Sequence, residues 1–293
     1  MQIVRLGPRT DAPRLAVVDG PRMWPFPARF STLADLLRLS ADELRGVIDE
    51  TSRTEAGQAP AGPASAPIDG LTEVWAAGVT YQRSEEARVE ESGTPDIYTR
   101  VYTAERPELF FKATARRVAG PGEPIVVRAD STWDVPEPEL ALVINARAEI
   151  VGYTVADDVS SRSIEGDNPL YLPQAKIYAR SCALGPGVTP VSDVPDPYAL
   201  GIRMRILRDG QAGWSGQTST RELKRRLDEL VEYLFREDTF PDGVILCTGT
   251  GLVPDTPFTL QAGDSVEIDI DQLGTLSNPV VRGKSGLGLS ATA

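Results

Sequence analysis

Short apolar runs separated by polar turns make up most of this chain after residue 70. LTEVWAAGVTY has the pattern of a buried strand, and further strand-like runs follow it from residue 109: LFFKAT, PIVVRA, ELALVI, IVGYTV, GIRMRIL, GVILCTG, DSVEIDI and NPVV. Because turn signals come at short intervals between these runs, the pattern predicts a mainly β domain.

One helix interrupts the predicted strands. Its apolar positions recur at helical spacing and lie on one face: Leu223, Leu227, Leu230, Val231 and Leu234. Ser219 and Glu222 have the S-x-x-E spacing of a capping box and predict where this helix begins. Ahead of the strands, RSEEARVEES is polar and predicts an exposed helix or a flap.

The first 50 residues predict a small α+β unit. MQIVRL and RLAVVDG are strand-like, Ser31 is placed to cap a helix, and Ser40 with Glu43 forms a second capping box. Residues 51–70 are rich in Ala, Pro, Gly and Ser without periodicity, which is typical of a linker. We therefore predict a small amino-terminal domain with its linker at 1–66 and a catalytic domain at 67–293.

The composition narrows the class of protein. With 41% hydrophobic residues among 293, the chain can bury a substantial core. No apolar run approaches the roughly 20 residues of a membrane span, and MQIVRLGPRTDAPRL lacks the layout of a signal peptide. These features predict a cytoplasmic protein that does not bind membranes. The net charge of −12 argues against nucleic acid as a partner.

The chain contains no histidine, which excludes Ser-His-Asp and Cys-His catalysis and His-based zinc sites. Acid–base chemistry must therefore use Asp, Glu, Lys, Tyr, Cys or a metal-bound water. Cys182 and Cys247 match no zinc spacing, and we expect two buried thiols rather than a disulfide.

A pair of acidic residues in VPEPELALVI is the first candidate site. Glu137 and Glu139 are two apart, so on a strand both carboxylates project from the same face. Pro136 and Pro138 place them at a strand start or on an edge strand. A divalent cation relieves the repulsion between two such carboxylates, and oxygen ligands suit Mg²⁺, Mn²⁺ or Ca²⁺ better than zinc. The alternative interpretation is two solvated glutamates on an edge strand.

A second acidic pair, Asp157-Asp158, ends the strand in EIVGYTVADDVSSR. Functional groups often lie in the loops that follow strands. By alternation, one aspartate faces the core side and the other faces solvent. Either aspartate could instead cap a helix or form a turn, and spacing alone does not bring the two acidic pairs together.

Six segments follow one another in this order: ELFFKAT, EPELALVI, GYTVADDVSSR, LPQAKIYARSCALGP, LCTGTG and AGDSVEIDI…LGTLSNPV. Together they resemble the fumarylacetoacetate hydrolase superfamily over residues 71–285. GVTYQRSEEAR, IYTRVYTAERPELFFKAT and EGDNPLYLPQAKIY resemble its 2-keto-3-deoxy sugar acid dehydratase branch. The resemblance implies an α+β, mainly β fold: a distorted mixed β-roll with a small amino-terminal domain, in homodimers or homotetramers.

Residue by residue, the resemblance implies that Glu137, Glu139 and Asp158 bind Mg²⁺, with Mn²⁺ or Ca²⁺ as possible substitutes. It implies that Lys176 is catalytic, although a lysine in such a stretch can also be a surface residue that only snorkels. In CTGTG, Thr250 is expected near the substrate, where backbone N–H groups suit a carboxylate; the alternative is an ordinary turn.

Two further segments contain candidates. In ERPELFFK, Glu108 is a candidate catalytic acid, and Arg106 and Lys112 are candidates for substrate contact; the alternative is a surface ion cluster. In TYQRSEEAR, Ser84 and Arg83 are candidates for substrate contact from a flap, or members of an ordinary exposed helix.

The expected activity is Mg²⁺-dependent dehydration of a small 2-keto acid, 2-keto-3-deoxy-D-arabinonate, to 2,5-dioxopentanoate. An acylpyruvate-type hydrolase or a decarboxylase is the alternative among enzymes. A sugar-acid-binding relative without turnover is the alternative among non-enzymes. Hydrolases of this superfamily commonly activate water with a histidine, so the absence of histidine favours the dehydratase branch.

Overall fold

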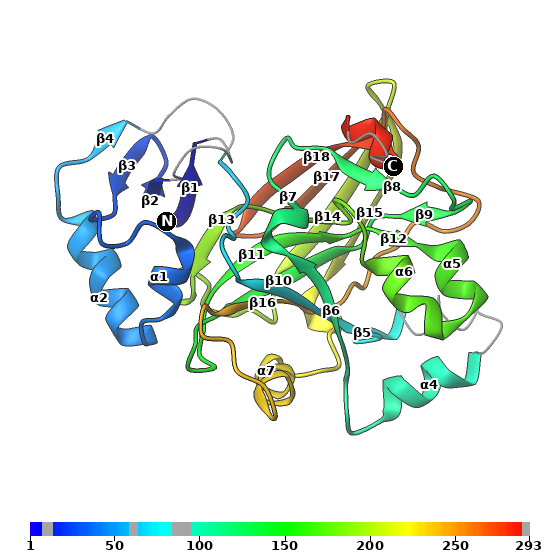
Figure 1. Cartoon of the computed structure of the whole chain (residues 1–293), viewed down its shortest axis with the longest axis horizontal. Helices are drawn as coiled ribbons and strands as arrows, with labels where there is room; N and C mark the ends of the chain where they lie inside the picture. Colours follow the sequence, from blue (N-terminus) through cyan, green and yellow to red (C-terminus); the bar gives the residue numbers. More distant parts are fainter. Residues whose placement is uncertain (8–13, 59–63, 84–94, 289–293) are drawn as a thin grey trace.

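The structure, a computed structural model, describes residues 1–7, 14–58, 64–83 and 95–288. Its framework is a long mixed sheet with the strand order β4-β3-β2-β1-β13-β11-β10-β16-β5-β6, and β7 pairs with β13 (Figure 1). Its strands are β1 (Gln2–Leu6), β2 (Arg14–Asp19), β3 (Arg22–Pro25), β4 (Gly57–Gln58), β5 (Glu73–Gly78), β6 (Glu108–Thr114), β7 (Val118–Ala119), β10 (Pro138–Ile144), β11 (Ile150–Asp158), β13 (Cys182–Pro190) and β16 (Val244–Cys247).

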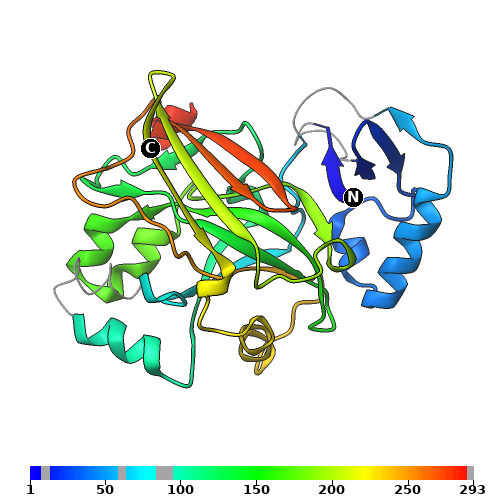
Figure 2. The ribbon, with the colours of Figure 1, turned by 180° about the vertical axis from the view of Figure 1, so that it is seen from behind.

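A second sheet, with the order β15-β14-β17-β18-β8, packs across the long sheet and is seen in front in Figure 2. Its strands are β8 (Ile125–Val127), β14 (Gly201–Arg208), β15 (Gln211–Ser219), β17 (Ser265–Ile270) and β18 (Gly274–Arg282). A small sheet joins β9 (Asp134–Val135) to β12 (Ser160–Ser161). Parallel and antiparallel pairs both occur, which confirms the predicted mainly β fold of mixed strands.

Short helices surround the sheets. The α-helices described are α1 (Leu33–Leu37), α2 (Ala41–Ser52), α4 (Pro95–Thr103), α5 (Arg162–Asp167), α6 (Leu172–Lys176) and α7 (Leu227–Phe235). The 3₁₀ turns are η1 (Ala115–Arg117), η2 (Pro169–Tyr171), η3 (Val191–Asp193), η4 (Thr220–Glu222) and η5 (Lys284–Leu287). In the part of the chain that the structure covers, no helix combines the length and apolarity that crossing a membrane requires.

Strand β10 lies between two hydrophobic cores. Leu140 and Leu142 face the core between the two sheets, and Ala141 and Val143 face the core shared with α1 and α2. Side chains alternate along a strand, so a strand between two cores must be apolar on both faces. This explains the unbroken apolar run after Glu139 and places the E-x-E pair at the start of a central strand.

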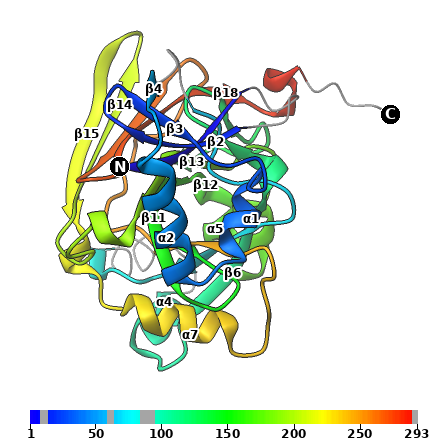
Figure 3. The ribbon, with the colours of Figure 1, turned by 90° about the vertical axis from the view of Figure 1, so that its left-hand side faces the viewer.

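The amino-terminal strands extend the long sheet, because Ile3 on β1 is paired with Val188 on β13. Figure 3 shows α1 and α2 covering this end of the molecule. Part of the predicted linker is a strand, since Gly57 and Gln58 form β4 and pair with β3. The domain boundary between residues 66 and 67 remains a prediction.

Two predicted helix starts are wrong. Thr32, not Ser31, caps α1, because its hydroxyl accepts from Asp35 N. Ser219 caps only the short turn η4, and α7 begins at Leu227. Leu223 takes an extended conformation and forms a β-bridge with Tyr81, so it cannot belong to the helix.

Other local predictions are confirmed. Ser40 and Glu43 form the predicted capping box of α2, and Cys182 and Cys247 are free, buried thiols. Most of the segment RSEEARVEES lies outside the described residues. The pattern search did not find β13, which contains two prolines and two glycines, or β15, whose residues are almost all polar or small.

Candidate metal and substrate site

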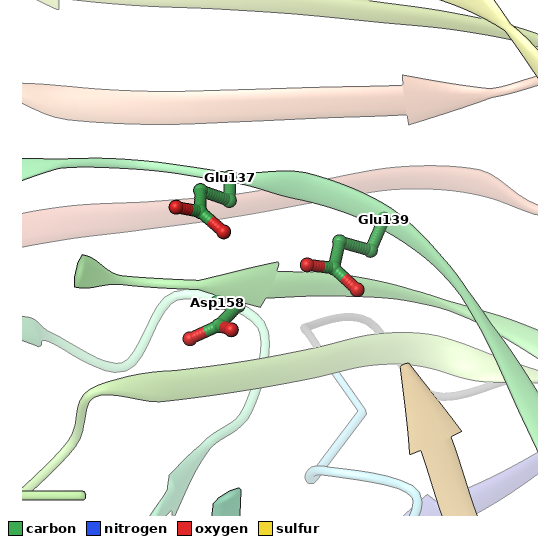
Figure 4. A group of neighbouring side chains, drawn as sticks. All are labelled: Glu137, Glu139 and Asp158. Carbon is green, nitrogen blue, oxygen red and sulfur yellow. The ribbon is translucent and has the colours of Figure 1, made fainter. Parts of the chain in front are cut away.

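Three carboxylates meet where β10 begins and β11 ends. The hairpin register places Glu139, on β10, opposite Ala156, so Glu139 and Glu137, the residue just before β10, lie beside Asp158 on β11. One oxygen atom from each side chain lies within 4.8 Å of the other two, and all three residues are buried. Figure 4 shows both glutamates projecting to the same side of their strand. The predicted common direction of the E-x-E pair is therefore correct.

Two other predictions for these acidic residues need correction, one for the position of β10 in the sheet and one for the exposure of the Asp157-Asp158 pair. Strand β10 is not an edge strand, because β11 and β16 flank it on either side. Pro138 is tolerated there because pairing with β16 starts only at Ala141. Asp157 does not face solvent: it is buried, and its Oδ1 accepts from Glu137 N at 3.1 Å.

Lys176 contacts two of the three carboxylates. Its Nζ donates to Glu137 Oε2 at 2.8 Å, to Asp158 Oδ2 at 3.0 Å and to Ser160 Oγ at 2.6 Å. The side chain is only 2% exposed, which rules out the snorkelling interpretation. Helix α6 delivers this lysine from its last residue, directly across the site from β10.

A second lysine supports the site from behind. Lys112, on β6, is fully buried, and its Nζ pairs with Asp158 Oδ1. The same Nζ donates to the main-chain oxygen atoms of Val159 at 3.1 Å and Lys176 at 2.6 Å. Lys112 does not line the cavity of the site, so it is placed to support the site rather than to face a substrate.

The sequence search missed two charged residues on α5. Arg162 Nη2 lies 3.2 Å from Glu137 Oε1, and Arg162 Nη1 lies 3.4 Å from Glu165 Oε2. Both residues are buried. Their spacing of three, directly after the Asp157-Asp158 loop, is the signal that would have identified them, because residues three apart share a helix face.

The buried charges at the site do not balance. Four carboxylates and three cations contribute: Glu137, Glu139, Asp158, Glu165, Lys112, Arg162 and Lys176. Burial raises the pKa of Asp157 to about 8, so this fifth carboxyl group is largely neutral at pH 7. With Glu139 ionised, the form that a bound cation favours, one net negative charge is left, which a divalent cation and a singly charged acid together bring to zero. The all-oxygen donor set suits Mg²⁺, and the site therefore fits that cation.

Glu139 has a strongly perturbed environment. Burial, with the charges of Asp158 and Glu137, raises its pKa well above the usual range. Its Oε2 accepts from the main-chain N–H of Gly249 at 2.6 Å. A bound cation would relieve the same repulsion, because it compensates the charges that surround this carboxylate.

The triad and Lys176 open into a cavity of about 60 Å³. Its wall also includes Val79, Glu108, Glu165, Leu172 and Thr250. Glu108 comes from β6, opposite Gly78 in register, on a different wall from Lys176. The cavity therefore brings together the predicted metal ligands, both predicted catalytic residues and Thr250.

Thr250 lines the cavity, but its Oγ1 lies 2.9 Å from Pro138 O on β10 and 3.0 Å from Leu252 O, so main-chain acceptors already engage this hydroxyl. The two predicted arginine contacts are placed elsewhere. Arg106 is exposed, with its guanidinium 5.4 Å from the ring centre of Tyr233. Arg83 forms an ion pair with Asp255, and neither arginine lines the cavity. Ser84 lies outside the described residues.

A buried carboxylate triad in contact with a lysine, on a mixed sheet, is the donor set of a divalent-metal protein. The chain belongs to the fumarylacetoacetate hydrolase family: the family model described as "Fumarylacetoacetate (FAA) hydrolase C-terminal" matches residues 73–281.

Within that family, the chain is similar to sugar acid dehydratases. It is 53% identical over 248 residues, 85% of each chain, to a probable 2-keto-3-deoxyxylonate dehydratase of Haloferax volcanii. It is 46% identical over 218 residues, 73% of each chain, to the 2-dehydro-3-deoxy-D-arabinonate dehydratase of Saccharolobus solfataricus. A solved 2-keto-3-deoxy-D-arabinonate dehydratase, complexed with magnesium and 2,5-dioxopentanoate, superposes with a TM-score of 0.81 at 35% identity, covering 96% of this chain and 99% of that one.

Proposed function

We propose that this protein is a hydro-lyase that removes water from 2-keto-3-deoxy-D-arabinonate to give 2,5-dioxopentanoate, with Mg²⁺ as its cofactor. The observation that carries the proposal is the buried Glu137, Glu139 and Asp158 triad in contact with Lys176. The relatives' names support it, because both are named as dehydratases of 3-deoxy-2-keto acids with five carbons.

The two relatives' names describe one substrate when the xylonate, like the arabinonate, is of the D series. A pentonate has stereocentres at C2, C3 and C4; forming the 2-ketone removes the first, and loss of the C3 hydroxyl removes the second. D-xylonate and D-arabinonate share the configuration at C4, so their 2-keto-3-deoxy derivatives are the same compound. This chain is similar to both relatives, and the proposal therefore commits to the D configuration at C4.

The reaction requires proton transfers at C3, C4 and C5. A proton leaves C3, and the C4 hydroxyl departs with a proton as water. Loss of a proton from C5 and gain of one at C3 then move the double bond to C4–C5, and the resulting enol becomes the aldehyde. A divalent cation held by the triad supplies Lewis-acid polarisation of the substrate's 2-keto acid oxygen atoms.

Two side chains of the cavity match these proton transfers. We assign Lys176 to the proton transfers at C3, where its neutral amine would accept the proton and its ammonium form would return one, because its Nζ lies at the triad that would hold the cation. We assign Glu108 to the C4 hydroxyl, because its carboxyl group comes from the β6 wall, away from the hydrogen bonds of Lys176. Positioned acids and bases of this kind contribute about 10²–10⁴-fold each. We assign Thr250 and Glu165 to the cavity wall around the substrate.

The purified protein tests the proposal in a coupled assay. 2-Keto-3-deoxy-D-arabinonate is offered with Mg²⁺ and then with EDTA, and the semialdehyde product is followed through an NAD(P)-dependent dehydrogenase. The expected result is product only with Mg²⁺ and none from the L isomer. Turnover of an acylpyruvate with no semialdehyde would instead assign the protein to the hydrolases.

We further propose that the protein is cytoplasmic and forms a homodimer or homotetramer. The composition and the family resemblance support both statements. Light scattering coupled to size-exclusion chromatography measures the assembly, and a mass of 31.6 kDa would identify a monomer and contradict the second statement.

A further inference from the structure

The peptide between Thr248 and Gly249 is held at both ends. Its carbonyl oxygen, on Thr248, accepts from the Thr80 hydroxyl at 2.6 Å. Its N–H, on Gly249, donates to Glu139 Oε2 at 2.6 Å. One peptide plane therefore connects the Thr80 side chain to a carboxylate of the triad, across 168 residues of sequence between Thr80 and Thr248.

Thr80 itself is held in place by its surroundings. It is 1% exposed, and its main-chain oxygen accepts from Lys224 N at 2.9 Å. The preceding residue, Val79, has a φ of 52°, which is strained for a β-branched side chain. Tyr81, the residue after Thr80, forms a β-bridge with Leu223. Strain of this kind persists only where the surrounding structure over-determines it, as at active sites.

The contact between the two loops depends on the absence of a side chain at Gly249. A Cβ there would lie 2.0 Å from Thr80 Oγ1 and 2.9 Å from Ala77 O, and the residue's φ is 86°. Only glycine adopts this conformation and allows so close an approach without strain. The loop sequence thus permits the Thr80 hydroxyl to reach the peptide that donates to Glu139.

We propose that Thr80 is a positioning residue for the metal ligand Glu139, acting through the Thr248–Gly249 peptide. The inference rests on the metal site of the proposed function. A hydrogen bond to a peptide carbonyl polarises the peptide and strengthens the bond that its N–H donates. Mg²⁺ demands near-ideal octahedral geometry, so its affinity depends on how well each carboxylate is oriented.

A merely structural role would have a different signature. In that case the Thr80 hydroxyl would only satisfy a buried carbonyl, and its loss would reduce stability without changing Mg²⁺ affinity. Thr72 offers the matched control: it is also 1% exposed, and its hydroxyl donates to Asp242 O at 3.0 Å. Thr72 does not line the cavity.

The experiment compares Thr80→Ala with Thr80→Ser, since the two variants differ only in the hydroxyl. Mg²⁺ alone is titrated into each protein by calorimetry, and the thermal midpoint is measured in EDTA. We expect the Mg²⁺ dissociation constant to rise about 10–100-fold in Thr80→Ala, as when a group that orients a metal ligand is lost. It should stay near the wild-type value in Thr80→Ser and in the control Thr72→Ala.

The outcomes separate this inference from the proposed function. Equal Mg²⁺ affinity in folded Thr80→Ala and Thr80→Ser would overturn it, as would a wild-type protein that binds no Mg²⁺. If Thr80→Ala does not fold, a tenfold loss of affinity in Thr80→Ser, which keeps the hydroxyl, would likewise contradict it. Mg²⁺ binding without dehydration would reject the proposed reaction but leave the role of Thr80 standing.

Discussion

The Lys112 ammonium group donates to the main-chain oxygen of Lys176 at 2.6 Å, so one buried lysine holds the backbone of another. Lys112 also pairs with Asp158, to which Lys176 Nζ donates at 3.0 Å. The two lysines thus flank one carboxylate, Lys176 from the cavity and Lys112 from behind. This relationship leads to the first prediction.

Replacing Lys112 by Met should damage both stability and catalysis. The change removes the buried cation beside Asp158 Oδ1 and leaves only Lys176 paired with this carboxylate, and breaking a buried ion pair costs about 3–5 kcal/mol of unfolding free energy. Because the Lys176 backbone also loses a support, kcat should fall more than KM rises. Urea denaturation and steady-state kinetics check this, with the exposed Lys284→Met as control. A variant as stable as the wild type would contradict the pairing.

Replacing Glu139 by Gln should remove metal-dependent activity while leaving the fold intact. The Glu139 carboxylate is buried beside Glu137 and Asp158, which raises its pKa, so a neutral amide relieves repulsion in the metal-free protein. We therefore expect the thermal midpoint in EDTA to stay constant or rise.

The thermal midpoint in excess Mg²⁺ tests whether Glu139→Gln has lost metal binding. At a hundredfold excess over its dissociation constant, a ligand stabilises the wild type by about 2.7 kcal/mol. Glu139→Gln should lose most of this stabilisation. Wild-type activity and an unchanged Mg²⁺ response in the variant would show that Glu139 is not a metal ligand.

Replacing Gly78 by Ala should act on catalysis through Glu108. A Cβ at residue 78 would lie 2.1 Å from Glu108 Oε2, so the carboxyl group must move from its place in the cavity wall. We expect kcat to fall on the order of tenfold, a part of the 10²–10⁴ that a general acid contributes. The double variant Gly78→Ala, Glu108→Gln should have the same kcat as Glu108→Gln alone. Additive losses of kcat would show that Gly78→Ala does not act through Glu108.

The burial of Asp134 should make the free energy of unfolding depend on pH. It is buried, its Oδ1 has no hydrogen-bond partner in the described part of the chain, and burial raises its pKa to about 6. Between about pH 4 and 6 the folded state keeps a proton that the unfolded state releases, so this group's contribution to stability falls as pH rises.

Asp134→Asn should remove that contribution. Relative to the wild type, the variant should gain about 1–2 kcal/mol between pH 4 and pH 7, a discounted value for a shift of about two units. Urea denaturation at both pH values measures the difference. An equal pH dependence in the two proteins would show that Asp134 does not titrate in this window.

Part of the site follows from local rules that can be applied to the sequence alone. Alternation along a strand is fixed by covalent geometry, so Glu137 and Glu139 had to project together. The capping box at Ser40 involves only neighbouring residues, and it too was predicted correctly. The family resemblance added Asp158 and Lys176, which lie together in the structure.

The other features of the site depend on contacts between segments that are distant in the sequence. Nothing in the sequence around Lys112 shows that β6 would bury it behind Asp158, because burial depends on which strands pack over it. For the same reason the prediction that one of Asp157 and Asp158 faces solvent was wrong, since both are buried: alternation assigns the two faces of a strand, but it does not determine which faces are covered.

The sequence by itself determined the mainly β fold, the acidic pair on one strand face and the absence of histidine chemistry. Only the tertiary structure decided which charges meet, how many remain uncompensated, and that Thr80 reaches the peptide beside Glu139. The physical reason is range. Strand alternation and helix caps act over a few residues, whereas electrostatic pairing and desolvation depend on atoms that folding brings together from across the chain.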